Sequence, residues 1–183
     1  MKKALLILLL AGATQNLWSQ TYSTKKGYIR FFSSTLVKDI KADNNEVVNS
    51  LNSSTGELLF TASIKAFSFE NKTMQKHFND PAYMDSDLHP TASFKGTITN
   101  LKAINFKANG TYPAFVSGDL TIKGVTKKIT TTCTITVNNG AISSNAVFKV
   151  QREDFGINPS GMAITKIAKE IEVTVQNTYE SVQ

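Results

Sequence analysis

The stretch Asp119-Leu-Thr-Ile-Lys-Gly-Val-Thr-Lys127 consists of two alternating runs of apolar and polar residues that meet at Lys123-Gly124. Glycine tolerates the positive φ angle that tight turns require, so this pattern predicts a β-hairpin. The apolar residues of the two runs are spaced to share one face, and they are Leu120, Ile122, Val125 and Ile129. The stretch therefore predicts strands with one buried face and one exposed face.

Alternation with a period of two residues recurs along the chain, whereas helical periodicity is scarce. We predict strands at 27–32, 56–65, 92–98, 110–116, 130–137, 141–150 and 170–175, and a weak strand at Val47-Val48. Asn138-Asn-Gly140 predicts a second tight turn. The pattern indicates an all-β domain that forms a single antiparallel barrel or sandwich.

Two segments interrupt the alternation. Met74 and Phe78 are four residues apart, and Asp80-Pro81 is typical of a helix start. Residues 155–168 contain glycine and proline and suit a further helical turn. We therefore expect one or two short helices that cover the barrel.

The first twenty residues have the pattern of a secretory signal peptide. Two lysines precede an apolar run from Ala4 to Ala13, and small and polar residues follow. The run is shorter than the roughly 20 residues that span a bilayer. We predict a signal peptide over 1–20, cleavage near Ser19 or Gln20, and a periplasmic or secreted domain over 21–183.

The charge does not suggest a nucleic-acid partner. Twenty basic and 14 acidic residues give a net charge of +6. The lysines are scattered over predicted polar strand faces, and only Arg30 and Arg152 are arginines. A nucleic-acid surface would show a basic stripe with aromatic residues, which this sequence lacks.

Cys133 is the only cysteine, so an internal disulfide cannot form. It shares a predicted strand face with Ile135 and Val137, which suits a small buried apolar side chain. No G-x-S-x-G motif and no phosphate-binding glycine loop occurs. Glu153 and Asp154 are adjacent, so on a strand they would point to opposite faces. We do not expect an enzyme.

The strongest candidate metal ligands lie within thirteen positions and are His77, Asp80, Asp85, Asp87 and His89. The two histidines lack the i,i+4 spacing of a helical zinc pair, and no Cys/His signature is present. They are also the only histidines available as axial ligands of a haem. We expect no metal and no cofactor, and we keep a metal- or haem-dependent enzyme as a third hypothesis.

Three motifs occur in order along the chain. They are Phe94-Lys-Gly96 downstream of Asp80-Pro81, the hairpin Leu120-Thr-Ile-Lys-Gly-Val-Thr-Lys127, and Arg152-Glu-Asp-Phe-Gly-Ile157. In this order they resemble the YceI-like family of exported, lipocalin-like proteins, although the His-containing first strand common in that family is absent here. The resemblance implies a lipocalin-like antiparallel barrel of about eight strands, with an elongated apolar cavity for an isoprenoid or similar lipid.

Eleven phenylalanines supply the aromatic content, and several of them fall in predicted strands, including Phe106 and Phe115. Inward-facing residues of a barrel either fill its core or line a cavity. With the resemblance, the sequence favours a cavity. The candidate ligand-binding residues are Phe31, Phe60, Ile64, Phe67, Met74, Phe78, Tyr83, Met84, Phe94, Phe148, Arg152 and Phe155.

The first hypothesis is a non-enzymatic carrier or store for an apolar lipid, such as an isoprenoid, a quinone or a prenyl phosphate. A charged head group would lie near Arg152, Lys149 or Lys166. The alternative is a secreted interaction or structural module that binds a protein through its outer surface. Transient contact with a membrane and a homodimer are both left open.

Overall fold

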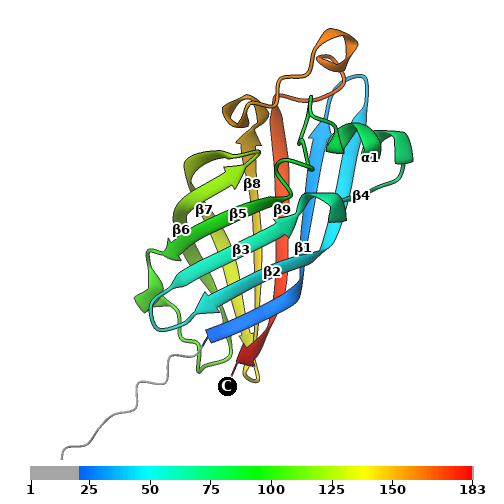
Figure 1. The fold of residues 1–183 in the computed structure, drawn as a ribbon. Helices are drawn as coiled ribbons and strands as arrows, with labels where there is room; N and C mark the ends of the chain where they lie inside the picture. The colour runs from blue at the N-terminus through cyan, green and yellow to red at the C-terminus, as the bar shows by residue number, and fades with distance from the viewer. Residues whose placement is uncertain (1–20, 183) are drawn as a thin grey trace, which may run out of the picture.

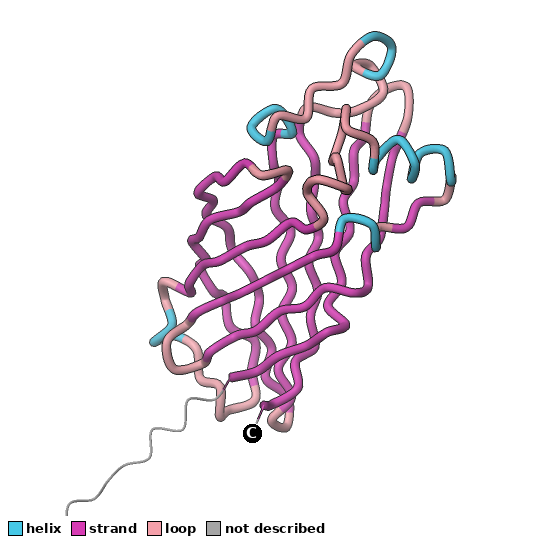
Figure 2. Tube along the Cα trace, viewed as in Figure 1, coloured by secondary structure: helices cyan, strands magenta, loops and turns pink. Residues whose placement is uncertain are grey.

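The computed structural model describes residues 21–182, and in this range eight long strands form a closed antiparallel barrel (Figures 1 and 2). The long strands are β1 (Thr21–Ser34), β2 (Asp39–Asn52), β3 (Glu57–Ser63), β5 (Thr91–Ile98), β6 (Gly110–Ile122), β7 (Val125–Asn138), β8 (Ala141–Gln151) and β9 (Glu170–Val182). The remaining elements are the two-residue strand β4 (Ser68–Phe69), the helix α1 (Lys72–Asn79), and 3₁₀ turns at Ile64–Ala66, Leu101–Ala103, Arg152–Phe155 and Gly161–Ala163. The predicted signal peptide lies outside the described residues.

The strand order shows a barrel and not a sandwich. Neighbouring strands follow the order β1-β9-β8-β7-β6-β5-β3-β2, and β1 also pairs with β2 to close the ring. β1 is irregular between Thr24 and Ile29, where its register with β2 shifts, and its pairing with β9 is interrupted between Ser23 and Tyr28. Closure removes the exposed edges that an open sheet would present.

Both predicted hairpin turns are confirmed. Lys123 and Gly124 have φ angles of 49° and 74°, and Asn139 and Gly140 have φ angles of 50° and 83°. Two central residues with positive φ make the two-residue turn that matches the twist of the flanking strands. Ile122 pairs directly with Val125 across the first of these turns.

The expectation of one or two short helices is confirmed by α1, which contains Met74 and Phe78; Asp80-Pro81 follows the end of this helix and leads into turns, so it does not start a second helix. Asn71 caps α1, because its Oδ1 accepts hydrogen bonds from the backbone N–H groups of Thr73 (2.8 Å) and Met74 (3.2 Å). Asp80 is extended, with a ψ angle of 156°. The residue before a proline avoids the helical region, so Pro81 ends the helix.

The second strand is much longer than predicted. It covers fourteen residues, and its polar character hid it from the alternation pattern. Asn44 is fully buried in β2, where its Nδ2 donates a hydrogen bond to the carbonyl oxygen of Ser63 (2.9 Å). A buried amide with a distant partner carries no local signal of strand structure.

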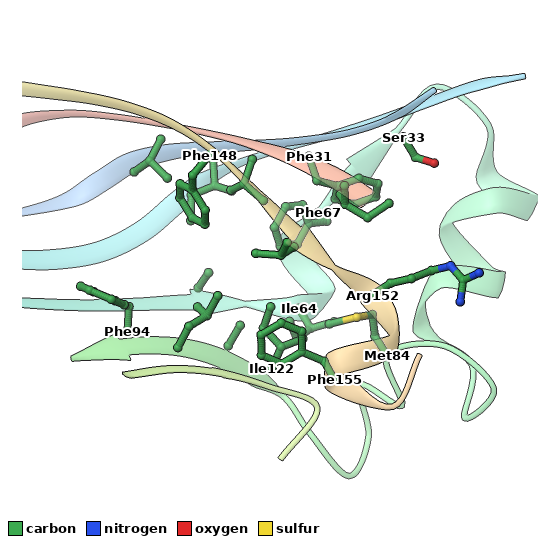
Figure 3. Close-up of a pocket in the computed structure, with 18 of the residues that line it drawn as sticks. Phe31, Ser33, Ile64, Phe67, Met84, Phe94, Ile122, Phe148, Arg152 and Phe155 are labelled. Carbon is green, nitrogen blue, oxygen red and sulfur yellow. The ribbon is translucent and has the colours of Figure 1, made fainter. Parts of the chain in front are cut away.

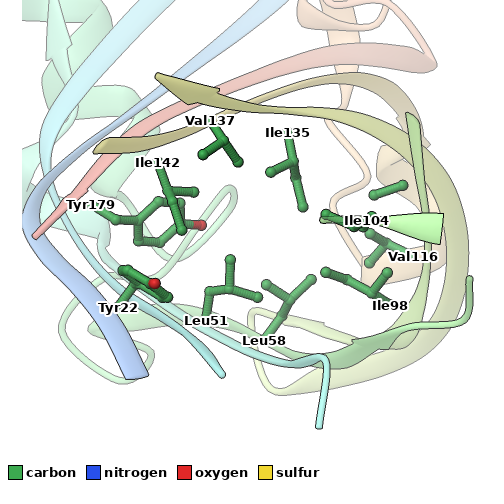
Figure 4. Packing of buried hydrophobic residues seen from close by; sticks show 11 residues of the cluster. Tyr22, Leu51, Leu58, Ile98, Ile104, Val116, Ile135, Val137, Ile142 and Tyr179 are labelled. Carbon is green, nitrogen blue, oxygen red and sulfur yellow. The ribbon is translucent and has the colours of Figure 1, made fainter. Parts of the chain in front are cut away.

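An apolar core fills the lower half of the barrel, the half that holds the start of β1 and the end of β9 in Figure 1. Figure 4 shows its side chains pointing inward from opposite walls. The core comprises Tyr22, Leu51, Leu58, Ile98, Ile104, Ala114, Val116, Ile135, Val137, Ile142 and Tyr179. Because this packed layer closes the lower end, any open space in the barrel lies above it.

The upper end, which we call the mouth, is surrounded by three segments. They are the β1–β2 hairpin, the region from β4 through α1 to Pro90, and the connection from Arg152 to Lys169 (Figure 1). The last of these contains the 3₁₀ turn Gly161–Ala163, which matches the further helical turn expected within 155–168, and the 3₁₀ turn Arg152–Phe155, which precedes that range. No helix within residues 21–182 is long and apolar enough to cross a bilayer.

Candidate functional site

A cavity of about 660 Å³ runs through the barrel from the mouth to the lower core. On β9 it is lined by every second residue from Ile171 to Tyr179, a span of roughly 26 Å at about 3.3 Å per residue. At the mouth its lining includes exposed residues such as Lys38 and His77, whereas its floor includes the buried Leu51. The cavity therefore opens at the mouth and ends on the core.

All twelve side chains that the sequence analysis proposed as ligand-binding line this cavity, and Figure 3 shows several of them. They are Phe31, Phe60, Ile64, Phe67, Met74, Phe78, Tyr83, Met84, Phe94, Phe148, Arg152 and Phe155. Their contact with a ligand stays a prediction. Three phenylalanines do not line the cavity: Phe115 is 51% exposed, Phe106 packs against the lower core, and Phe32 lies on β1.

Four phenylalanine rings, which we call the mouth cluster, gather below α1. Phe31 comes from β1 and Phe78 from α1. Phe69 belongs to β4, and Phe67 directly precedes that strand. Phe78 stacks on Phe31 with 5.3 Å between ring centroids, and it lies 5.0 Å from Phe69 and 5.6 Å from Phe67. The cluster fixes α1, which has no fully buried residue, against the barrel.

Phe60 and Phe94 line the middle of the cavity with 6.2 Å between their ring centroids. The Phe94 ring lies close to Gly96 and Gly118, which pair directly across β5 and β6. A Cβ at Gly118 would stand 2.6 Å from Phe94 Cζ. The paired glycines thus let the ring lie flat against the wall, which keeps the cavity open.

Arg152 organises the covering segment at the mouth. Its side chain is buried, its Nε donates to the carbonyl oxygen of Ala168 (3.1 Å), and its Nη1 donates to that of Ile157 (2.8 Å). The backbone N–H of Ala168 in turn donates to Ser33 Oγ (2.9 Å). Arg152, a predicted ligand-binding residue, therefore joins the start of the 152–169 connection to Ile157 and to the end of the connection. The hydrogen bond to Ser33 attaches the end of this connection to β1.

The other two cations suggested for a head group differ in position. Lys166 is exposed and lines the mouth, together with Lys38. Lys149 does not line the cavity, and its Nζ forms an ion pair with Glu170 Oε1 at 2.7 Å. Positive charge on the cavity lining is therefore found at the mouth.

The ionisable groups deep in the cavity are neutral near pH 7. Burial raises the pKa of the Cys133 thiol to about 11, and Cys133 is free and lines the cavity. Burial also raises the pKa of Tyr179 to about 12. A thiol with so high a pKa is a poor nucleophile.

The candidate metal ligands do not converge. His77 lines the cavity, while the ring of His89 lies beside Gly124 at the β6–β7 turn. In the part of the chain that the structure describes, no three histidine, cysteine, aspartate or glutamate side chains gather as a metal site.

Several lining residues were missed by the sequence analysis, notably Asn177 and Tyr179 on β9 and Ser144 on β8. The predicted last strand ended at Val175, whereas β9 continues to Val182. Continuing the alternation of Ile171, Val173 and Val175 by four residues would have placed Asn177 and Tyr179 on the inner face.

The sequence matches the YceI-like domain over residues 16–179. Among solved structures, it is similar to a polyisoprenoid-binding domain from Saccharophagus degradans implicated in plant cell wall breakdown, with a TM-score of 0.77 and 11% identity over 90% of this chain and 99% of that chain. BcnA of Burkholderia cenocepacia gives a TM-score of 0.69 and 18% identity over 85% and 96% of the two chains. The Campylobacter jejuni YCEI protein gives a TM-score of 0.57 and 20% identity over 100% of this chain and 99% of that chain. No curated protein matches in sequence.

These structures share the fold of the barrel described above, at low sequence identity. The domain match establishes the family of this chain, because it covers most of the sequence, from before β1 to near the end of β9. The resemblance carried by the hairpin and by the Arg152–Ile157 motif is thereby confirmed: the chain belongs to the YceI-like family.

Proposed function

We propose that this protein is an exported, non-enzymatic carrier or store for an isoprenoid-like or other long-chain lipid held in the barrel. The observation that carries the proposal is the cavity of about 660 Å³, lined largely by apolar side chains and open at the mouth. Ligand sites of small molecules have cavities of this order. The Saccharophagus degradans structure, a polyisoprenoid-binding domain with the same fold, supports the proposal.

The shape and the lining of the cavity suit a flexible chain. At about 0.8 kcal/mol per buried CH₂, a fifteen-carbon chain would gain on the order of 10 kcal/mol before the cost of association. Met74 and Met84 line the upper cavity, and methionine adapts its shape to irregular ligands. Within this class, the candidates are an isoprenoid, a quinone and a prenyl phosphate.

Loading from a membrane is part of the proposal. The N-terminal signal pattern supports export to the periplasm or the medium. At the tip of the β1–β2 hairpin Leu36 is fully exposed and Val37 is 63% exposed, and the exposed Lys38 follows them at the mouth. An aliphatic tip beside a lysine suits transient contact with an anionic lipid surface.

The test is to purify the mature chain from its native envelope, extract it with organic solvent, and identify the extract by mass spectrometry. We expect a stoichiometric long-chain lipid. Ala62→Trp would place a large side chain into the cavity, whereas Thr61→Trp points outward from the same strand and is the matched control. Lipid should be lost from the first variant and kept by the second, with circular dichroism confirming that both are folded.

Folded protein without lipid would favour the interaction module instead. Exposed apolar side chains occur on four strands of the outer wall, at Val48, Leu59, Phe115 and Val147. These side chains are spread over the wall and do not form one contiguous apolar patch of the kind that marks a protein-binding surface. Binding of a protein partner is therefore the second candidate function. Light scattering after size-exclusion chromatography tests the homodimer separately.

A further inference from the structure

Three polar side chains meet at the floor of the cavity, where its apolar walls end on the lower core. Asn177 and Tyr179 project from β9 and Ser144 from β8, and all three line the cavity. Asn177 is 4% exposed and Tyr179 is 5% exposed. Burial of polar groups in an apolar barrel is costly unless they form hydrogen bonds.

A chain of hydrogen bonds connects them to a fourth residue. Asn49 Nδ2 on β2 donates to Asn177 Oδ1 (2.7 Å), and Asn177 Nδ2 donates to Ser144 Oγ (3.1 Å). Ser144 Oγ and the Tyr179 hydroxyl are 3.3 Å apart, and either of them is able to donate. This last contact is long for a hydrogen bond between two hydroxyls, which is commonly near 2.8 Å.

The hydrogen bonds of this chain use only one of the two hydroxyl protons, and at its other end the buried Asn49 Oδ1 accepts no hydrogen bond. Ser144 and Tyr179 carry two hydroxyl protons, and a single contact joins them to each other. Whichever hydroxyl donates in that contact, the other proton has no protein acceptor among the described residues. Burial raises the pKa of Tyr179, so its phenol keeps its proton at neutral pH. A buried donor without an acceptor is destabilising, and a ligand oxygen would satisfy it.

The charges decide which kind of oxygen fits. The cationic side chains that line the cavity, Lys38, Arg152 and Lys166, all come from segments around the mouth. An anionic phosphate or carboxylate at the floor would lie far from them, in an apolar environment that penalises charge. A neutral carbonyl or hydroxyl oxygen carries no such penalty.

We propose that Ser144 and Tyr179 form a hydrogen-bonding subsite at the cavity floor for a neutral oxygen atom of the lipid. The lipid then lies with this oxygen inward and its hydrocarbon chain toward the mouth. The subsite favours isoprenoid alcohols and carbonyl compounds such as quinones over prenyl phosphates and over plain hydrocarbons. This inference rests on the proposed lipid-binding function.

The experiment compares farnesol with farnesene, two fifteen-carbon isoprenoids of which only farnesol carries a hydroxyl group. The affinity of each compound is measured by how well it displaces the fluorescent probe N-phenyl-1-naphthylamine from lipid-stripped mature protein. We expect the double variant Ser144→Ala/Tyr179→Phe to weaken farnesol binding by about three- to tenfold, the effect of losing one neutral hydrogen bond, because each single variant keeps one hydroxyl proton without an acceptor. Farnesene binding should be unchanged in the double variant.

Tyr22→Phe is the matched control, because Tyr22 is a buried tyrosine of the same core that does not line the cavity. It should leave the affinities for both compounds unchanged, and the melting temperature of each variant shows that it is folded. If the double variant Ser144→Ala/Tyr179→Phe changes the affinities for both compounds equally, or changes neither affinity, the subsite is wrong while lipid binding stands. If the wild type binds neither compound, the proposed function itself fails.

Discussion

At the scale of single residues, Gly118 decides how much room the cavity has. An added Cβ there would lie 2.4 Å from Gly96 Cα and 2.5 Å from the carbonyl oxygen of Lys95, both of which are backbone atoms. We expect Gly118→Ala to lower the free energy of unfolding by about 1–3 kcal/mol. It should also weaken probe binding, because Phe94 is pushed inward. Urea denaturation and probe titration measure the two effects.

Gly110→Ala is the control for this substitution. Its Cβ would meet ring atoms and the hydroxyl of Tyr112, a side chain at the lower end of β6 that is able to rotate away. The loss of stability should be smaller than at Gly118, and probe affinity should not change. Equal effects at the two positions would contradict the role given to the glycine pair.

A second residue-scale prediction concerns Asp43 on β2. Its carboxylate accepts hydrogen bonds from Arg30 Nε (2.7 Å) and from the Tyr28 hydroxyl (2.6 Å). The hydrogen bond from Arg30 is the main reason that the pKa of Asp43 is lowered, and the bond from Tyr28 adds to it. A lowered pKa in the folded state stabilises the protein above the ordinary carboxyl pKa of about 3.9, and this stabilisation is lost as the pH falls below it.

Asp43→Asn should therefore be less stable than the wild type at neutral pH, and the difference should shrink as the pH falls below about 4. Chemical denaturation from neutral pH down to about pH 3 measures this difference. Asp154→Asn, at an exposed carboxylate, controls for the removal of one surface charge. A constant difference for Asp43→Asn at all pH values would rule out the carboxylate as its source.

At the scale of elements, α1 acts as a cover that one ring holds in place. Phe78→Ala removes the ring that stacks on Phe31 and contacts Phe69. We expect faster hydrogen exchange over residues 72–79 and a several-fold faster dissociation of the bound probe, because local opening costs less. Lys76→Ala changes an exposed side chain of the same helix and should alter neither rate. If Phe78→Ala leaves both rates unchanged, α1 does not control access.

The elements also show what the sequence reveals and what it hides. The turns at Lys123-Gly124 and Asn139-Gly140 were predictable, because their signal lies in two adjacent residues. The length of β2 was not, because Asn44 is buried by a partner nineteen positions away. Asp80-Pro81 is compatible with a helix start and with a helix end; the extended Asp80 before Pro81 ends α1, and the packing of Phe78 holds the preceding turn as helix.

The same contrast holds for the site. Phenylalanines such as Phe60 and Phe94 were predictable from alternation within their strands. Asn177 and Ser144 were harder to predict, because polar residues on an inner face look like the outer face of a strand, although continued alternation along β9 would have placed Asn177 inward. That the two lie side by side follows from cross-strand pairing, in which Asn177 is opposite Ser144, and pairing is not visible in one sequence.

At the scale of the whole molecule, the barrel has a packed lower half and a hollow upper half. On the proposed function, stripping the bound lipid should lower the melting temperature, and adding it back should restore it. A ligand at one hundred times its dissociation constant contributes about 2.7 kcal/mol to stability. Hydrogen exchange should rise around the cavity, for example over residues 171–175, and stay low around Val137 and Ile142 in the core. Equal changes in both halves would mean that the ligand stabilises the molecule elsewhere.

The core that closes the lower end also limits how the proposed carrier would work between two membranes. Within residues 21–182 the cavity opens at the mouth alone, so the barrel would not connect two membranes at once as a conduit does. On the proposed function, each lipid would enter and leave through the same rim, and the carrier would leave the donor membrane before it meets the acceptor. Transport by such a shuttle depends on diffusion of the loaded protein, and its rate should scale with the concentration of free barrels between the membranes.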